Sequence, residues 1–289
     1  MKILFTTDWH LSGTKPSSRV DINFIETQIR KVEEVFNIAN EAKVDMIIHG
    51  GDITDKARTP YLIINKIIPL FKENKIPFEI IIGSHDTVGY NLESLDYTGI
   101  GNLIKSGYIQ ILNQSNMEGF HCCVISKVPE GFENKVLVMH DMVSPDPLPF
   151  TYISLEEIAS KNKNVIVLSG HLHKQFKKEL NGSIFINPGP LVRTDISEIN
   201  IKPSVAIIDT KTRETNFIEL THALPGSKVF AVERAQEIKS RELAFQSFVE
   251  SLGQKFCNIN IEEVLLNIAN EKRIEIAVVE KCLTLLRSQ

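Results

Sequence analysis

The stretch ILFTTDWHL, residues 3–11, joins an apolar run directly to a polar motif. The run Ile3–Thr7 is typical of a buried β-strand, because such strands are short and almost continuously hydrophobic. Asp8 and His10, which follow at once, are residue types that bind metal ions. The same arrangement recurs four times: Met46–His49 before Gly51 and Asp52, Phe78–Ile82 before GSHD at residues 83–86, Val136–Met139 before His140, and Val165–Ser169 before GHLH at residues 170–173.

The five motifs are expected to meet at one place in the fold. In open α/β proteins, ligand-binding loops gather at the carboxyl ends of the strands. Mixed imidazole and carboxylate ligands suit Mn²⁺, Fe²⁺ or Zn²⁺ better than Ca²⁺. Two such ions about 3.5–4 Å apart can hold a phosphate, generate a hydroxide and stabilise the leaving oxygen. Asp52 is the natural bridging ligand, because the glycines before it allow a tight turn.

Each motif alone also has a purely structural interpretation. Aspartate and histidine at a strand end often cap a turn, and a single His140 is more often a hydrogen-bonded interior residue than a ligand. The pair His171 and His173 is more informative, because alternate residues of an extended segment point the same way. Only the whole set, in this order, predicts a metal site. The other histidines, His49, His121 and His222, are interpreted as structural.

Together, the motifs resemble those of the calcineurin-like metallophosphoesterase superfamily, which run D-x-H, G-D, G-N-H-D, H and G-H-x-H. Within it, Thr7–Leu11 looks like the opening S-D-W-H-L of the SbcD-type DNA exonucleases, the nuclease partners of SMC-like ATPases. The segment NPGPLVRTD, residues 187–195, resembles the proline-glycine segment of that branch. The likeness covers roughly residues 1–220 and implies an α/β fold, a four-layer αββα sandwich.

The resemblance also implies a role for each motif residue. Two divalent metal ions are expected, with Mn²⁺ as the expected ion. His85 matches the catalytic histidine, which touches the scissile phosphate and protonates the leaving oxygen, and Asp55 matches the acid that orients it. Lys174 and Arg193 lie near the motif loops and are expected to contact substrate. The implied metal ligands are Asp8, His10, Asp52 and His173 for one ion, and Asp52, Ser84, His140 and His171 for the other.

Ser84 departs from the family pattern, which has asparagine at this position. A carbonyl oxygen ligand is thereby replaced by a hydroxyl on a shorter side chain. The serine could bind the metal weakly, bind it through water or leave it loosely held. The expectation is a working but altered second site, with a decayed site as the alternative.

Helical spacing of apolar residues predicts helices over residues 22–39, 61–71 and 92–105. From residue 109 onward short strands dominate, interrupted by one helix near 155–160. The composition changes at Ala223–Ser227, which predicts a domain boundary there. The resemblance implies that residues 1–222 are the metallophosphoesterase (nuclease) domain. Residues 228–289 are predicted to be helical, at 234–252, 261–270 and 274–286. This appendage could cap the domain or bind a partner.

Composition restricts the class of protein. The chain has 289 residues, 43% of them hydrophobic, and no apolar run approaches the roughly 20 residues of a membrane span. Residues 1–5 lead directly into a motif and are interpreted as a strand, not as a signal peptide. The four cysteines lack metal-ligand spacing, and the neighbours Cys122 and Cys123 are a poor disulfide pair. A cytoplasmic protein is expected.

The formal net charge of −4 does not identify the substrate, because an autonomous duplex binder usually carries a basic excess. A small basic rim suffices where a partner supplies further phosphate contacts. The expected function is a DNA phosphodiesterase in repair or recombination, working with an SbcC-type SMC-like ATPase. A second copy of the chain is a further candidate partner. The alternatives are a phosphoesterase for a cyclic nucleotide or phosphomonoester, and a non-catalytic binding subunit.

Overall fold

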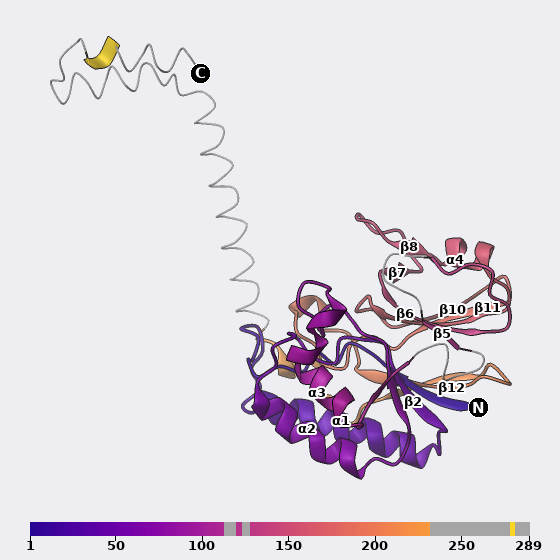
Figure 1. Cartoon of the computed structure of the whole chain (residues 1–289), viewed down its shortest axis with the longest axis horizontal. Helices are drawn as coiled ribbons and strands as arrows, with labels where there is room; N and C mark the ends of the chain where they lie inside the picture. Colours follow the sequence, from indigo (N-terminus) through magenta and orange to yellow (C-terminus); the bar gives the residue numbers. More distant parts are fainter. Residues whose placement is uncertain (113–119, 123–127, 232–277, 281–289) are drawn as a thin grey trace. The chain divides into compact units, whose positions relative to one another are not determined.

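The computed structural model describes residues 1–112, 120–122, 128–231 and 278–280 (Figure 1). The chain forms two compact units, residues 1–232 and residues 233–289. The predicted division into domains 1–222 and 228–289 remains a prediction. The helices predicted at 234–252 and 261–270, and most of the one at 274–286, lie outside the described residues.

A six-stranded sheet forms one half of the first unit. Its first strand pairs in parallel with the strand that follows it in the sequence, and antiparallel with a strand from the end of the domain. The first motif strand is therefore central, as its uninterrupted burial requires. In sheet order the strands are β13 (Thr215–Glu219), β12 (Ser204–Asp209), β1 (Lys2–Thr6), β2 (Met46–His49), β3 (Phe78–Ile80) and β4 (Gln110–Ile111).

A five-stranded sheet forms the other half. Two of the motif strands, β6 and β9, are parallel neighbours within it. A short two-strand pair, β7 (Val143–Ser144) with β8 (Ile153–Ser154), follows β6. In sheet order the five strands are β10 (Phe176–Leu180), β11 (Ser183–Asn187), β9 (Ile166–His171), β6 (Val136–Asp141) and β5 (Phe120–Cys122).

Helices cover the outer faces of both sheets, which confirms the predicted αββα sandwich (Figure 1). One apolar cluster joins the six-stranded sheet to α1 (Phe24–Glu41), α2 (Tyr61–Glu73) and α3 (Gly99–Lys105). A second lies between the two sheets, and a third joins the five-stranded sheet to α4 (Leu155–Lys161). The short elements η1 (Leu92–Tyr97), η2 (Ile196–Glu198) and α5 (Gly226–Val229) complete the unit.

Helix α1 links the outer layer to the first motif. Asn23 caps its start by accepting a hydrogen bond from Glu26 N at 3.1 Å. Lys31 is buried on its inner side and donates from Nζ to the backbone oxygen of Leu191 at 2.8 Å. Burial lowers the pKa of Lys31 to about 7. Because Leu191 N donates to Asp8 O at 3.0 Å, this contact holds the segment after β11 against the end of β1.

The local predictions missed one helix break and the strands β7, β8 and β10. The helix predicted over residues 92–105 is divided at Thr98, whose extended backbone ends η1 and whose hydroxyl accepts from Gly101 N to begin α3. Strand β10 was not predicted, because only Phe176 is buried in this edge strand and its lysines face solvent. No helix in the described part of the chain has the length and hydropathy of a bilayer span.

Candidate metal centre

The polar motifs lie together where strands from both sheets end. In the six-stranded sheet, β1 and β2 run parallel, so their motifs emerge at the same edge. In the five-stranded sheet, β6 and β9 are paired from Val136 with Ile166 to Asp141 with His171, which brings their histidines side by side. Residues far apart in the sequence therefore form one cluster, as the strand-end argument predicts.

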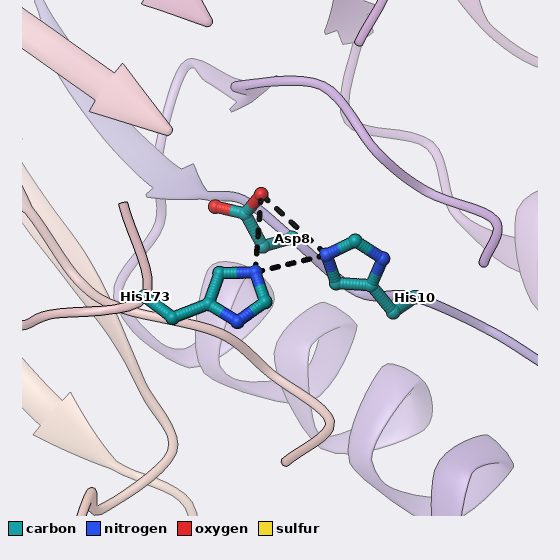
Figure 2. Close-up of side chains that lie close together, drawn as sticks. All are labelled: Asp8, His10 and His173. Carbon is teal, nitrogen blue, oxygen red and sulfur yellow. Dashed lines mark hydrogen bonds and ion pairs between the residues drawn. The ribbon is translucent and has the colours of Figure 1, made fainter. Parts of the chain in front are cut away.

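The first group of candidate ligands is Asp8, His10 and His173 (Figure 2). The Nε2 atoms of the two histidines are 3.0 Å apart, and each lies 3.8 Å from Asp8 Oδ1. Asp8 is fully buried and His10 nearly so. Three potential ligand atoms therefore point at one small volume.

The second group is Asp52, His140 and His171. His140 Nε2 lies 3.0 Å from Asp52 Oδ2, and the two imidazole rings are 5.1 Å apart. The same Oδ2 atom is 4.0 Å from His10 Nε2 of the first group. One carboxylate oxygen thus faces both groups, which is the position of a bridging ligand.

The donor set fits divalent cations. Metal–ligand bonds of about 2.0–2.2 Å leave neighbouring ligand atoms roughly 3 Å apart, which matches the spacing between His10 and His173. His173 Nδ1 contacts the carboxylate of Glu198 and therefore carries the proton, so its Nε2 holds a lone pair. Buried lone pairs and carboxylates that face one another require a positive charge between them.

The carboxylates are held in place by main-chain and hydroxyl donors. Asp8 Oδ2 accepts from Thr7 Oγ1 and from His171 N, both at 3.0 Å. Asp52 Oδ1 accepts from His85 N at 2.7 Å. The hydrogen bond from His171 N joins the strand ends of the two sheets, and the one from His85 N joins two motif loops. The position of each carboxylate is therefore fixed by more than one motif.

The backbone is strained at several candidate ligands. Asp8, His10, Asp52 and His171 have φ angles of 50°, 44°, 58° and 75°. The left-handed region costs a non-glycine residue about 1–3 kcal/mol and is maintained only where the surroundings enforce it. Four such residues in one cluster indicate that the loops are shaped for a site and not for stability alone.

Gly83 allows the closest approach between two motif loops. A Cβ atom at this position would lie 2.2 Å from Asp52 Oδ1 and 2.3 Å from Asp52 N. Any other residue would therefore displace the candidate bridging carboxylate. The glycine of the GSHD motif is required by packing against Asp52.

Burial and charge set the pKa values within the cluster. Burial lowers the pKa of His10 to about 3 and raises that of Asp8. Burial acts to lower the pKa of His140, but its hydrogen bond to Asp52 and the charge of Asp8 raise this pKa to about 9. Burial acts to raise the pKa of Asp52, yet the contacts with His140 and His10 hold it below its usual range. The carboxylates therefore stabilise positive charge here, which favours cation binding.

His85 is exposed beside the two groups, with its ring 4.8 Å from that of His10. Its Nδ1 donates to the backbone carbonyl oxygen of Asp55 at 2.7 Å, so Nε2 is the nitrogen left to exchange a proton. This contact corrects the expectation for Asp55. The group that orients His85 is the main-chain carbonyl of Asp55, not its carboxylate.

The two residues predicted to contact substrate, Lys174 and Arg193, differ in their exposure. Lys174 is exposed and donates from Nζ to Asp146 Oδ2 at 2.6 Å. Arg193 is only 2% exposed, and its guanidinium donates to the backbone oxygen of Ile201 at 3.1 Å. The prediction for Arg193 is therefore corrected, because a side chain enclosed among backbone carbonyls holds a loop and does not face a phosphate.

Ser84 lies beside the second group, and its hydroxyl donates to Asp52 Oδ2 at 3.4 Å. The serine thus contacts the candidate bridging carboxylate.

Two further carboxylates were missed at the sequence level. Asp86 is fully buried; its Oδ2 accepts from Asp52 N at 2.9 Å and its Oδ1 from Thr54 N at 3.2 Å, so it ties together the second and third motif loops. Burial raises its pKa to about 7. Glu198 contacts His173 from 25 residues away. The aspartate-x-x-glutamate pattern at 195–198 is typical of a capped turn and was not used in the sequence analysis; nothing in it points to the histidine.

Residues 1–182 match the family model for calcineurin-like phosphoesterases. Because this match covers more than half of the chain and contains all five metal-ligand motifs, the chain belongs to the calcineurin-like phosphoesterase family. The enzymes of this family use a dinuclear divalent metal site. The protein is accordingly a metal-dependent hydrolase with phosphodiesterase-type relatives.

Curated relatives include two archaeal proteins, each named DNA double-strand break repair protein Mre11. The one from Methanosarcina mazei is 27% identical over 219 residues, which are 68% of this chain and 34% of that protein. The one from Thermoplasma acidophilum is 21% identical over 267 residues, 83% of this chain and 67% of that protein. The chain spans about a third of the length of the first of these relatives.

Solved structures with a similar fold include a novel archaeal phosphodiesterase, with 15% identity and a TM-score of 0.41 over 76% of this chain and all of that one. A dimetal phosphatase from Danio rerio has 9% identity and a TM-score of 0.47, covering 72% of this chain and 91% of that one.

Proposed function

We propose that this protein is a two-metal DNA phosphodiesterase of the SbcD type that acts in DNA repair or recombination. The observation that carries the proposal is Asp52 Oδ2, which faces His140 on one side and His10 on the other. One oxygen between two histidine-rich groups is suited to bridge two cations. The names of the curated relatives support DNA as the substrate.

In this proposal the ligands keep the assignments made above. Asp8, His10, Asp52 and His173 hold one ion, and Asp52, His140 and His171 hold the other, with Ser84 beside it. We propose Mn²⁺ for both. When bound, the two ions would activate a water molecule and neutralise the charge of the phosphate.

His85 would assist departure of the sugar oxygen. Its Nδ1–H is donated to Asp55 O, which fixes the ring and leaves Nε2 to hold and deliver a proton. The exposed position of His85 allows contact with a phosphodiester. Lys174, exposed next to His173 in the sequence, is proposed to contact a neighbouring phosphate when it exchanges Asp146 for substrate.

The substrate class is tested by comparing three phosphate esters. With Mn²⁺, the purified protein is expected to cleave DNA and bis-p-nitrophenyl phosphate, to turn over the monoester p-nitrophenyl phosphate poorly, and to lose all three activities when a chelator is added. Strong monoester turnover with inert DNA would contradict the proposal. That result would support the alternative, a phosphoesterase for small molecules.

Ser84 favours a second candidate, a binding subunit with a decayed metal site, because a hydroxyl replaces the family amide. We expect two Mn²⁺ ions of unequal affinity, and we expect Ser84→Asn to strengthen the weaker site by about tenfold or more, because even changes to the partners of metal ligands alter affinity by that factor. Isothermal titration calorimetry measures both. Fewer than two ions at saturation, unchanged in Ser84→Asn, would support the non-catalytic candidate.

We further propose an SMC-like ATPase of the SbcC type and a second copy of this chain as partners. Tyr61 and Tyr97 are both exposed and line the same surface pocket, which supports a protein interface, because apolar side chains that gather on a surface often mark a partner site. Sedimentation of the chain, alone and with such an ATPase, tests both partners. A monomer that does not co-sediment would contradict them.

A further inference from the structure

Glu198 is a carboxylate outside both ligand groups that contacts the side chain of a candidate metal ligand, His173. It is 5% exposed and lies on η2, the short turn that follows the proline-glycine segment. Its Oε1 contacts His173 Nδ1, and its Oε2 accepts from Thr194 N at 2.6 Å and Asp195 N at 3.2 Å. Both oxygens are therefore engaged, one by the histidine and one by the main chain.

This arrangement determines which nitrogen of His173 carries its proton. An ionised carboxylate has no hydrogen to donate, so Glu198 can only accept from the imidazole. The proton must then be on Nδ1, which leaves the lone pair on Nε2. That Nε2 atom is the one 3.0 Å from His10 Nε2 and 3.8 Å from Asp8 Oδ1.

Glu198 differs from the groups that orient the other site histidines. Backbone carbonyl oxygens accept from Nδ1 of His140, at 2.7 Å from Gly50 O, and from Nδ1 of His85, at 2.7 Å from Asp55 O. Only His173, among these three, has an ionised partner at Nδ1. A carboxylate partner makes an imidazole a stronger electron donor than a carbonyl does.

We propose that Glu198 is a positioning residue, which fixes His173 in the tautomer that can bind metal and strengthens it as a ligand. The proposal rests on the metal-dependent function proposed above. It assigns to the turn at residues 195–198 a role beyond capping. It also explains why a chain segment without candidate ligands is packed against the centre.

The substitution Glu198→Gln tests the proposal with little change in size. Glutamine has one carbonyl oxygen for the two backbone donors, so its amide N–H must face His173 and the histidine must accept. The proton then moves to Nε2, and the ligand lone pair is lost. We expect one of the two Mn²⁺ sites to weaken by about 10- to 100-fold, the usual effect of removing such a partner, while the other site is unchanged.

A matched control is available at Glu34. This carboxylate accepts from Thr221 N at 2.6 Å, from His222 N at 3.0 Å and from His222 Nδ1 at 2.9 Å, so it has the same kinds of partners at a histidine outside the metal centre. Glu34→Gln should lower the melting temperature through the same loss of hydrogen bonds. It should leave both Mn²⁺ affinities unchanged.

The readouts are Mn²⁺ titration by calorimetry and the ¹⁵N spectrum of the histidine rings of the metal-free protein. The wild type should show His173 protonated on Nδ1, and Glu198→Gln should show it protonated on Nε2. An Nε2-protonated His173 in the wild type would overturn the proposal, even if the variant failed to fold. Equal Mn²⁺ affinities in Glu198→Gln and Glu34→Gln would also overturn it.

These outcomes are independent of the reaction. A wild type with two Mn²⁺ ions and no activity on DNA would contradict the proposed function and leave the role of Glu198 intact. Normal nuclease activity with an unchanged His173 tautomer in Glu198→Gln would contradict the role of Glu198 and leave the proposed function intact.

Discussion

Asp52→Asn is expected to abolish phosphodiester hydrolysis and to weaken both metal sites together. The asparagine keeps the size of the side chain but removes the charge of the oxygen that faces His10 and His140. The asparagine amide also has an NH₂ group in place of one carboxylate oxygen. It therefore keeps only one oxygen to accept from donors such as His85 N. Loss of about 4 kcal/mol of transition-state stabilisation, within the range that metal ions supply, corresponds to a roughly thousandfold lower rate.

The measurements for Asp52→Asn are turnover of bis-p-nitrophenyl phosphate and Mn²⁺ binding by calorimetry. Asp45→Asn is the matched control, because Asp45 is exposed at the opposite end of the same strand, where it accepts from Lys2 N. The control should keep both ions and full activity. If Asp52→Asn loses only one of two ions, Asp52 is a ligand of a single site and the bridging assignment is wrong.

His85→Ala is expected to remove hydrolysis of DNA while both metal ions stay bound. The histidine is exposed and its ring is bonded to Asp55 O, so its removal leaves the buried ligands in place. General acid catalysis contributes about 10²–10⁴ in rate, and the turnover number should fall by that factor. The fall should be much smaller for bis-p-nitrophenyl phosphate, because p-nitrophenolate departs without a proton.

This difference between the two substrates shows whether His85 acts as a general acid or as a metal ligand. His85 lies close enough to His10 and Asp52 to hold a metal with them. If it were a ligand, His85→Ala would lower the number of bound Mn²⁺ ions and slow both substrates equally. His222→Ala, at a half-exposed histidine bonded to Glu34, is the control and should change neither rate nor metal binding. A His85→Ala protein that cleaves DNA as fast as the parent would mean that the assignment is wrong.

Much of the fold could be predicted because the local signals were strong. The core strands of the motifs are nearly continuous apolar runs, and parallel strands impose a common edge on the polar residues that follow them. Helix α1 begins at a capping asparagine and presents a regular apolar side. Weak local signals gave errors: the break at Thr98 depends on one hydroxyl bonded to Gly101 N, and edge strand β10 has only one buried residue.

The site residues divide in the same way. The motif residues were predictable because metal chemistry restricts their types and the strands determine their position. Partners from distant segments were not, because a hydrogen bond between His173 and Glu198 leaves no periodic pattern. The structural role of Arg193 could not be predicted for the same reason. The sequence near the motif loops does not distinguish a buried arginine from an exposed one.

The sequence by itself determined the αββα class, the edge at which the motifs meet and the kinds of atoms that meet there. It could do so because strand burial, strand direction and ligand chemistry are properties of short segments. Only the tertiary structure decided that Asp52 Oδ2 faces both ligand groups, that the carbonyl of Asp55 orients His85, and that Glu198 is bonded to His173. These relations depend on how separate loops pack, and the packing is set by the whole core.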